Sequence, residues 1–364
     1  MKNPKPALKS QAFSLIELMV SMTILSAIML MFVGILDQTQ RSWELAQGRV
    51  SQFREARVAF DIITKNLGQA TLNTYVEQEE TDEDNITPTE FEVKSELNFQ
   101  ITYSDDLSGV SGDRPGHALF FQAPLGVSHR SEYGQLSNLM NARGYYVIFN
   151  SDEPFRPCFV EAPERKRYRL MEYLPPSEEN RVYVNHAENV DTGTGKFFTD
   201  WWEHDLEEYS RPLAENILTL VFMPRKAIAE IDGGGGRDEA ILSKNYKYDS
   251  QYPLGDASQD PNSSLLKHQL PPLVRVTMVA IDETSAIRLE EKYGDSPFFD
   301  RLGMSGNWMK DSSQYEDDID DLIEALEETS ATTSSEGMRI RYKVFSTTVA
   351  IQGAKWMTPI PSNS

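Results

Sequence analysis

Residues 10–36 read SQAFSLIELMVSMTILSAIMLMFVGIL and contain the longest apolar run of the chain. From Phe13 to Leu36 this run has 24 residues, and Glu17 is its only ionisable side chain. A helix rises ~1.5 Å per residue and the hydrocarbon core of a bilayer is ~30 Å thick, so a helix over this run is long enough to span a membrane. Burying a carboxylate at mid-membrane costs roughly 2.5–3.5 kcal/mol on insertion scales. Glu17 therefore needs a compensating partner, and we interpret it as a functional residue.

The residues around Glu17 resemble the N-terminus of a type IV prepilin or a type II secretion pseudopilin. The resemblance rests on a lysine-bearing leader, on the small residue Ala12, and on the segment FSLIEL (13–18) that opens the apolar run. In that family a prepilin peptidase cuts before the Phe, and the new N-terminus is methylated. The resemblance implies cleavage between Ala12 and Phe13, N-methylation of Phe13, and Glu17 as the fifth mature residue. The family usually has Gly before the cut, and since Ala is its nearest substitute in size, we expect cleavage here.

Two other kinds of N-terminal segment compete with this interpretation. A secretory signal peptide has an apolar core of about 7–15 residues followed by a small-x-small cleavage site. The run here is longer, carries an acid near its start and is followed by an amphipathic segment. An uncleaved signal anchor would look similar, but it gives no reason for an acid at position 17.

The charges that flank the apolar run predict its orientation. Lys2, Lys5 and Lys9 precede the run, and the positive-inside rule keeps such residues on the cytoplasmic face. The sequence has no second run of comparable length and apolarity. We therefore expect a single pass through the inner membrane, with a cytoplasmic N-terminus and a periplasmic head.

The composition of the chain limits its partners. It has 56 acidic and 35 basic residues and a net charge of −21. Nucleic-acid surfaces need clustered Lys and Arg to neutralise phosphates, so this balance argues against a nucleic-acid partner. Cys158 is the single cysteine, which excludes an intrachain disulfide, and we interpret it as a small buried hydrophobe. An apolar content of 40% is enough for one large core or two joined subdomains.

The segment after the apolar run predicts a continued helix. Residues 37–74 contain no proline, and glycine occurs only at 48 and 68. Apolar residues recur there at helical spacing: Leu36, Trp43, Ala46, Val50, Phe53, Phe60 and Leu67. This pattern predicts an amphipathic helix with one face for a globular core. Residues 13–36 and 37–74 together predict one spine helix with a transmembrane half and an amphipathic half, which is the pilin architecture.

Residues 75–364 are expected to form an α+β head with a mostly antiparallel sheet. The segment 75–90 is acidic and aperiodic, and we expect an exposed loop there. Runs rich in Val, Ile, Phe and Tyr predict strands at 91–103, 117–123, 144–149, 167–174, 217–223, 273–281 and 338–351. Helices are predicted over 285–293 and 315–329. Two stretches are interpreted as insertions in the head, 231–261 and 297–336.

Three segments of the head are similar to strands of J-type minor pseudopilins. They are RPLAENI (211–217), LPPLVRVTMVAIDE (270–283) and VFSTTVAI (344–351). The larger frame, which includes GAKW (353–356), resembles the prepilin-type cassette protein C family (Verru/Chthon cassette). The J-type resemblance implies that the three segments lie in the head sheet. Neither resemblance implies a biochemical activity.

The head shows no constellation typical of an enzyme. It has no HExxH pair and no GxSxG elbow, and the glycines at 233–236 lack the Lys-Ser/Thr of a phosphate-binding loop. The most site-like cluster is WWEHD (201–205), where a sugar- or metal-binding patch competes with a partly buried aromatic loop, which we favour. The acidic run 316–321 lacks the glycine of a calcium loop and has helical apolar spacing, so we prefer a solvated helix face. We expect no cofactor and no metal site.

The sequence therefore predicts a structural protein and not an enzyme. We expect a minor pilin-like (pseudopilin) subunit of a type II secretion or type IV pilus-like assembly. The resemblance implies that Glu17 docks with the N-terminal amino group of a neighbouring subunit. It also implies the partners: prepilin peptidase, other pilin-like subunits, the inner membrane and an assembly platform. The alternative is a membrane-anchored exported binding protein or enzyme that uses the N-terminal helix only as an anchor.

Overall fold

The structure of the chain is a computed structural model. It describes residues 15–51, 53–79, 90–108, 110–157, 159, 163–180, 202, 205–226, 241–251, 267–294, 296–299, 304, 308–331 and 340–354. The chain divides into two compact units, Met1–Gln52 and Phe53–Ser364.

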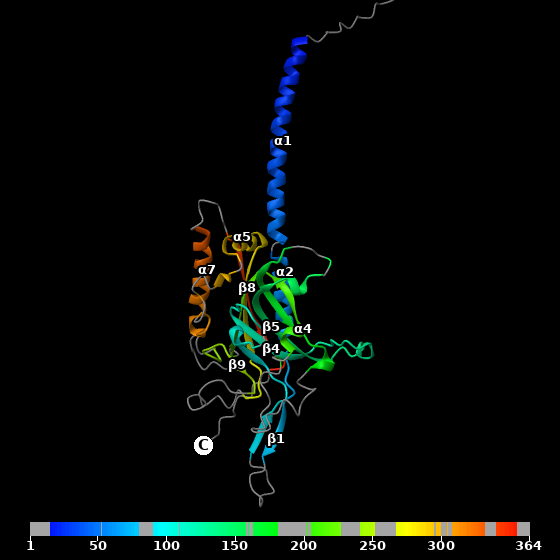
Figure 1. Ribbon diagram of the computed structural model, residues 1–364, viewed down its shortest axis with the longest axis vertical. Helices are drawn as coiled ribbons and strands as arrows, with labels where there is room; N and C mark the ends of the chain where they lie inside the picture. The colour runs from blue at the N-terminus through cyan, green and yellow to red at the C-terminus, as the bar shows by residue number, and fades with distance from the viewer. Residues whose placement is uncertain are drawn as a thin grey trace, which may run out of the picture. The chain divides into compact units, whose positions relative to one another are not determined.

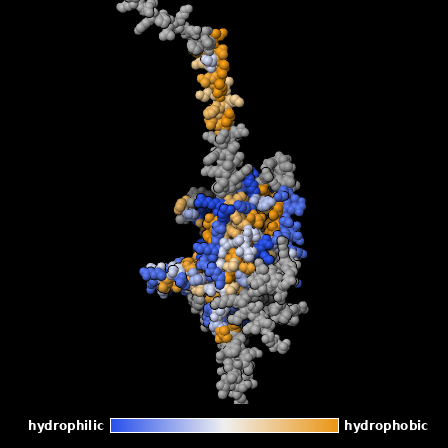
Figure 2. Space-filling view, turned by 180° about the vertical axis from the view of Figure 1, so that it is seen from behind, coloured by the Kyte–Doolittle hydropathy of each residue, from blue (hydrophilic) through white to orange (hydrophobic). Residues whose placement is uncertain are grey.

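The first unit contains helix α1, Leu15–Ser51 (Figure 1). The few polar residues of its apolar part turn their hydroxyls to the backbone, as Ser21 Oγ does to Leu18 O at 2.9 Å, so they do not interrupt the helix. Large apolar side chains are exposed along the helix, from Leu15 (79%) to Leu36 (46%). Figure 2 shows them as a hydrophobic surface on the described part of α1. Within the described ranges, no helix combines the length and the apolarity that a membrane crossing requires.

The second unit opens with helix α2, Arg54–Leu67. Its buried apolar residues recur at helical spacing on one face, as the sequence pattern predicts: Ala56, Ala59, Phe60, Ile63 and Leu67. A single helix as far as Thr74 is expected from the sequence, but the structure differs. Helix α1 ends at Ser51, Phe53 is not helical (φ −111°, ψ 17°), and α2 ends at Leu67. Beyond α2 the backbone turns to the sheet, where Thr71 N donates to Gln122 O at 3.0 Å.

The strands of the described residues pair antiparallel, in sheets of six, three and two strands (Figure 1). The six-stranded sheet has the order β7 (Ser210–Glu215), β6 (Lys166–Tyr173), β5 (Met140–Ser151), β4 (His117–Pro124), β3 (Gln100–Tyr103) and β9 (Tyr248–Asp249). The three-stranded sheet has the order β11 (Tyr342–Ala350), β10 (Leu273–Ile281) and β8 (Ile217–Arg225). Strands β1 (Tyr75–Glu79) and β2 (Glu90–Lys94) form the third sheet.

Helices cover both faces of the three-stranded sheet. Helix α2 lies on one face, where the rings of Phe60 and Phe345 are 5.7 Å apart. Helix α7 (Tyr315–Ala331) lies on the other, where the Tyr315 hydroxyl is 2.7 Å from Thr277 Oγ1. The register pairs Phe345 with Met278, and side chains alternate along a strand, so Thr277 and Met278 point to opposite faces.

Two further α-helices belong to the described head. Helix α5 (Glu283–Tyr293) is capped by Asp282, whose carboxylate accepts from Ser285 N at 2.8 Å. Such a cap satisfies one of the backbone donors that a helix start leaves unpaired. Helix α4 (Leu206–Tyr209) is a single turn before β7. The main core fills the space between α2 and the two larger sheets, with Ile63, Phe121 and Val276 fully buried.

The α+β class and the mostly antiparallel sheet are confirmed. Strand β10 has the predicted bounds, and β4 and β8 extend the predicted ones by one and two residues. Helices α5 and α7 lie where helices are predicted. The range 91–103, predicted as one strand, holds all of β3 and all but the first residue of β2. Strand β1 lies where an exposed loop is expected. The second insertion contains α7, and parts of both insertions lie outside the described residues.

Candidate functional site

The structure describes little of the residues that we assign to processing. Ala12 and Phe13, the predicted cleavage site, lie outside the described residues. Glu17 belongs to the first turn of α1, and its side chain also lies outside them. The described polar geometry is that of the head, where three clusters join elements that are distant in the sequence.

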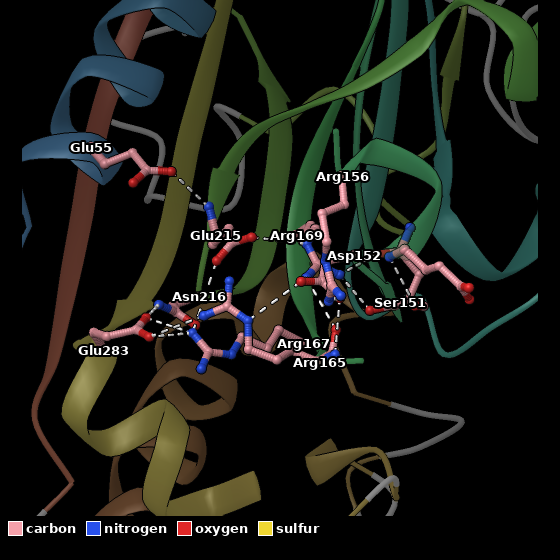
Figure 3. A network of polar contacts seen from close by, with 12 residues as sticks. Glu55, Ser151, Asp152, Arg156, Arg165, Arg167, Arg169, Glu215, Asn216 and Glu283 are labelled. Atoms are coloured by element: carbon pink, nitrogen blue, oxygen red, sulfur yellow. Dashed lines mark hydrogen bonds and ion pairs between the residues drawn. The ribbon is translucent and has the colours of Figure 1, made fainter. Parts of the chain in front are cut away.

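The first cluster is an arginine network formed by Arg167 and Arg169 of β6, by Arg165 just before that strand, and by the carboxylates around them (Figure 3). Arg167 is 4% exposed, and its Nη1 lies 2.6 Å from both carboxylate oxygens of Glu283 at the start of α5. Asn216 Nδ2 donates to Glu283 Oε2 at 2.8 Å. Burial opposes the ionisation of Glu283, but the hydrogen bonds from Arg167 and Asn216 outweigh it and hold its pKa below the usual value.

Asp152 forms the second half of the arginine network. Its Oδ1 accepts from Arg156 Nη2 at 2.6 Å and from the backbone N of Arg165 at 2.9 Å. Burial again opposes ionisation, and the bonds from Arg156 and Arg165 outweigh it, so the pKa of Asp152 lies well below its usual range. The carboxylate therefore stays charged at neutral pH.

Arg169 connects the arginine network to helix α2. It is 1% exposed, and its Nη1 donates to the backbone and side-chain oxygens of Asn150 at 2.5 and 2.9 Å. Its Nε donates to Glu215 Oε1 at 3.3 Å, and Glu215 N donates to Glu55 Oε1 of α2 at 3.0 Å. The network thus joins β5, β6, β7, α5 and α2 (Figure 3). Since its carboxylates are paired with donors, it suits a structural joint better than acid–base chemistry.

The second cluster, the α2 seat, lies under the C-terminal half of α2. Asn66 Nδ2 donates to the Tyr145 hydroxyl at 2.8 Å, and this hydroxyl donates to Glu172 Oε1 at 3.1 Å. Arg143 Nη1 lies 2.5 Å from the same oxygen. Burial, together with the nearby Glu172 carboxylate, raises the pKa of the Tyr145 hydroxyl. The hydroxyl therefore stays protonated, and a buried chain of hydrogen bonds runs from the helix to the sheet.

The third cluster surrounds His117 on β4, which is 1% exposed. Its Nδ1 accepts from Phe222 N at 3.1 Å, and its Nε2 donates to Met309 O at 2.9 Å. Burial lowers the pKa of His117 to about 4. The ring is therefore neutral at physiological pH, with its proton on Nε2, and it joins β8 to the segment before α7.

The other sequence candidates have structural roles where they are described. Trp202 is buried, stacks on Phe120 at 4.3 Å between ring centroids, and donates from Nε1 to Gln100 Oε1 at 3.1 Å. This agrees with the aromatic-loop interpretation of that residue. Residues 201, 203 and 204, the glycines 233–236 and Cys158 lie outside the described residues. The acidic run 316–321 lies on α7, and no group of three metal-ligating side chains occurs among the described residues.

None of the three clusters was singled out from the sequence. The alternation of Arg167 and Arg169 along the strand predicted at 167–174, with Arg165 two residues before it, is the one signal available, because alternate residues of a strand share a face. Their partners are up to 123 positions away, as for Arg167 and Glu290, and no local pattern connects them.

The comparisons with known proteins concern the N-terminal segment. No curated protein and no solved structure matches the chain. Residues 8–33 match the family model described as the prokaryotic N-terminal methylation motif, and this range includes Ala12, Phe13 and Glu17. The N-terminal segment of the chain is thus similar to that of type IV prepilins and pseudopilins.

Proposed function

We propose that this protein is a minor pilin-like subunit, of the pseudopilin kind, that an assembly machine builds into a filament from the inner membrane. The observation that carries the proposal is the match of residues 8–33 to the methylation motif. A prepilin peptidase cuts the chain between Ala12 and Phe13, and Phe13 becomes the methylated N-terminus. The role is structural and not enzymatic.

The apolar residues of α1 support membrane insertion before assembly. In the sequence, the run Phe13–Leu36 is long enough for a bilayer, whereas no helix among the described residues has both the length and the apolarity of a membrane span. The exposed side chains Leu15, Ile24 and Phe32 would face lipid first and neighbouring subunits afterwards. In both environments they leave water, which favours transfer from membrane to filament without an intermediate exposed to solvent.

Glu17 supplies the docking contact in this proposal. A carboxylate in an apolar environment is stabilised by a cationic partner, and the family supplies one in the free N-terminal amine of a neighbouring subunit. Each added subunit would then be set in axial register by one ion pair. The J-type resemblance of the three head segments suggests a position at or near the filament tip.

The contacts between elements of the head support a subunit that withstands pulling. Helix α2 is tied to the sheets by the α2 seat and by Glu55, and α5 is tied to β6 by Arg167. Such buried polar contacts between distant elements resist local opening. A subunit that is pulled from a membrane benefits from that resistance.

The test is incorporation into filaments. Glu17→Leu should leave the protein in the membrane fraction but absent from sheared filaments or from co-purified pilin-like subunits. Ser21→Leu is the matched control, since it adds the same side chain one turn later and keeps the carboxylate. Unchanged incorporation of Glu17→Leu would contradict the docking role. A membrane-anchored protein with an intact leader would favour the alternative of an exported binding protein or enzyme.

A further inference from the structure

A cleft of about 320 Å³ opens on the face of the three-stranded sheet that α7 covers. Its volume lies at the lower end of the roughly 300–1,000 Å³ typical of small-ligand sites. We name it the α7 cleft, after the helix whose first turn forms one wall. The residues that matter for its chemistry are Met223, Arg225, Ile241, Arg275, Tyr315 and Glu316.

Two arginines line the α7 cleft from adjacent strands. The register pairs Arg225 of β8 with Leu273, and Arg275 of β10 with Met223. Arg225 and Arg275 are therefore diagonal neighbours on one face of the sheet, with backbones roughly 7–8 Å apart. Two guanidinium groups at this separation can both bind one small anionic group.

Arg275 is held in place by three contacts. Its Nη1 lies 3.0 Å from Glu316 Oε1, its Nε donates to Ser346 Oγ at 3.4 Å, and its guanidinium lies 4.1 Å from the ring centre of Tyr315. Its Nη2 forms no hydrogen bond within the part of the chain that the structure describes. A fixed guanidinium with a spare donor loses little freedom when it binds a further acceptor.

Arg225 is the stronger indication of a ligand site in the α7 cleft. It is half-buried, and among the described residues its side chain has neither a hydrogen bond nor an ion pair. Its guanidinium donors can therefore bind an acceptor in the cleft without giving up a described contact. In a chain with net charge −21, carboxylates are abundant, yet none of the described ones pairs with it.

The cleft combines this charge with an apolar wall. Arg225, Arg275 and Glu316 sum to one positive charge, while Met223, Ile241 and the Tyr315 ring supply apolar surface. Guanidinium groups bind carboxylates through two parallel hydrogen bonds. One surplus charge matches a single carboxylate, and the strongly negative chain repels polyanions. We propose that the α7 cleft binds a carboxylate attached to an apolar group, from an acidic peptide or from a small organic acid.

The test measures binding to the full chain in detergent micelles by saturation-transfer NMR. The small-acid arm compares 3-phenylpropionate with its neutral amide, and the peptide arm compares acetyl-Phe-Glu-amide with acetyl-Phe-Gln-amide. We expect millimolar binding of at least one carboxylate, and binding of its neutral partner weaker by about tenfold. The arm that shows binding identifies the source of the carboxylate. This site is independent of processing and of filament entry.

Variants separate the cleft from the micelle and from the rest of the surface. Arg225→Gln should weaken carboxylate binding by about fivefold, the scale of one partly exposed ion pair. The matched control Arg57→Gln removes an exposed arginine of α2 and should change nothing. Because Arg225 has no described side-chain partner, its replacement should leave the thermal midpoint unchanged. Glu316→Gln frees Arg275 and should strengthen binding. Equal binding of acid and amide, absence of binding at about 10 mM, or binding unaffected by Arg225→Gln would each overturn the proposal.

Discussion

Asn66 of α2 donates a hydrogen bond of 2.8 Å to the hydroxyl of Tyr145 on β5, across 79 positions of the chain. Both residues are buried, so this bond lies between the helix and the inner face of the six-stranded sheet. It ends in the pair Glu172–Arg143, which belongs to two neighbouring strands. Helix α2 is therefore fixed to the sheet by a polar contact as well as by its apolar face.

Asn66→Ala tests this contact. The Tyr145 hydroxyl would lose its donor in a buried place, and we expect the free energy of unfolding to fall by about 1–3 kcal/mol. Urea denaturation measures the change. Lys65→Ala, one position earlier on the exposed side of α2, is the control and should change stability by less than about 0.5 kcal/mol. Equal effects of the two substitutions would mean that the α2 seat does not contribute to the free energy of unfolding.

Phe60→Ala tests the apolar side of the same helix. Phe60 is 8% exposed and packs on Phe345, which is also 8% exposed. Loss of the ring should lower the free energy of unfolding by about 3–5 kcal/mol, since both transfer and cavity terms are lost. The matched control is Val58→Ala, because Val58 is 51% exposed on the same helix. A decrease of less than about 1 kcal/mol in the free energy of unfolding for Phe60→Ala would contradict the packing of α2 on the core.

His117 predicts a pH dependence of stability. The unfolded state takes up a proton near pH 6.5, whereas the native state does so only near pH 4, so the unfolded state binds more protons between these values. The free energy of unfolding therefore falls as the pH falls from 6.5 to 4, by about 3 kcal/mol in total. Denaturation at a series of pH values measures it. His117→Gln should flatten the slope between pH 5 and 6.5, and replacing the exposed His129 should not. A slope that survives His117→Gln would assign the effect to other groups.

Arg167→Met tests the arginine network at α5. The substitution keeps much of the side-chain volume but removes the guanidinium that lies nearest to Glu283 and that pairs with Glu290, while Arg165 remains 3.9 Å from Glu283. We expect the free energy of unfolding to fall by about 1–3 kcal/mol, less than for a fully buried pair because Glu283 is half exposed. Amide hydrogen exchange should become faster in α5 first. Glu291→Gln, which changes an exposed residue of the same helix, serves as the control. Comparable exchange rates of α5 in both variants would contradict the claim that Arg167 fixes α5 to β6.

The elements that could be predicted are those with a strong local period. Strand β10 is rich in β-branched residues and lies between prolines and Asp282, and α7 has regular apolar spacing. Strand β1 is not predicted because Glu77 and Glu79 are typical of loops. Its pairing with β2 joins residues that are separated in the sequence, so no local pattern indicates it. The end of α1 at Ser51 has no proline or glycine to mark it.

The polar clusters could not be predicted for a similar reason. Asn66 reads as an ordinary helix residue, and only the fold brings Tyr145 under it. His117 lies in a strand whose apolar neighbours give no sign that Phe222 and Met309 will supply its two hydrogen bonds. In contrast, the processing motif is contiguous, so residues 13–18 could be interpreted without any structure.

The central claim, that the chain is processed as a prepilin, is tested most directly by mass spectrometry of the mature N-terminus. The protein should be expressed with a prepilin peptidase and recovered from membranes. We predict that the mature protein begins at Phe13 and carries one methyl group on its α-amine, and that Ala12→Leu retains the leader. A membrane-bound protein that keeps Met1–Ala12 in the presence of an active peptidase, or that is cut at another position, would contradict the account.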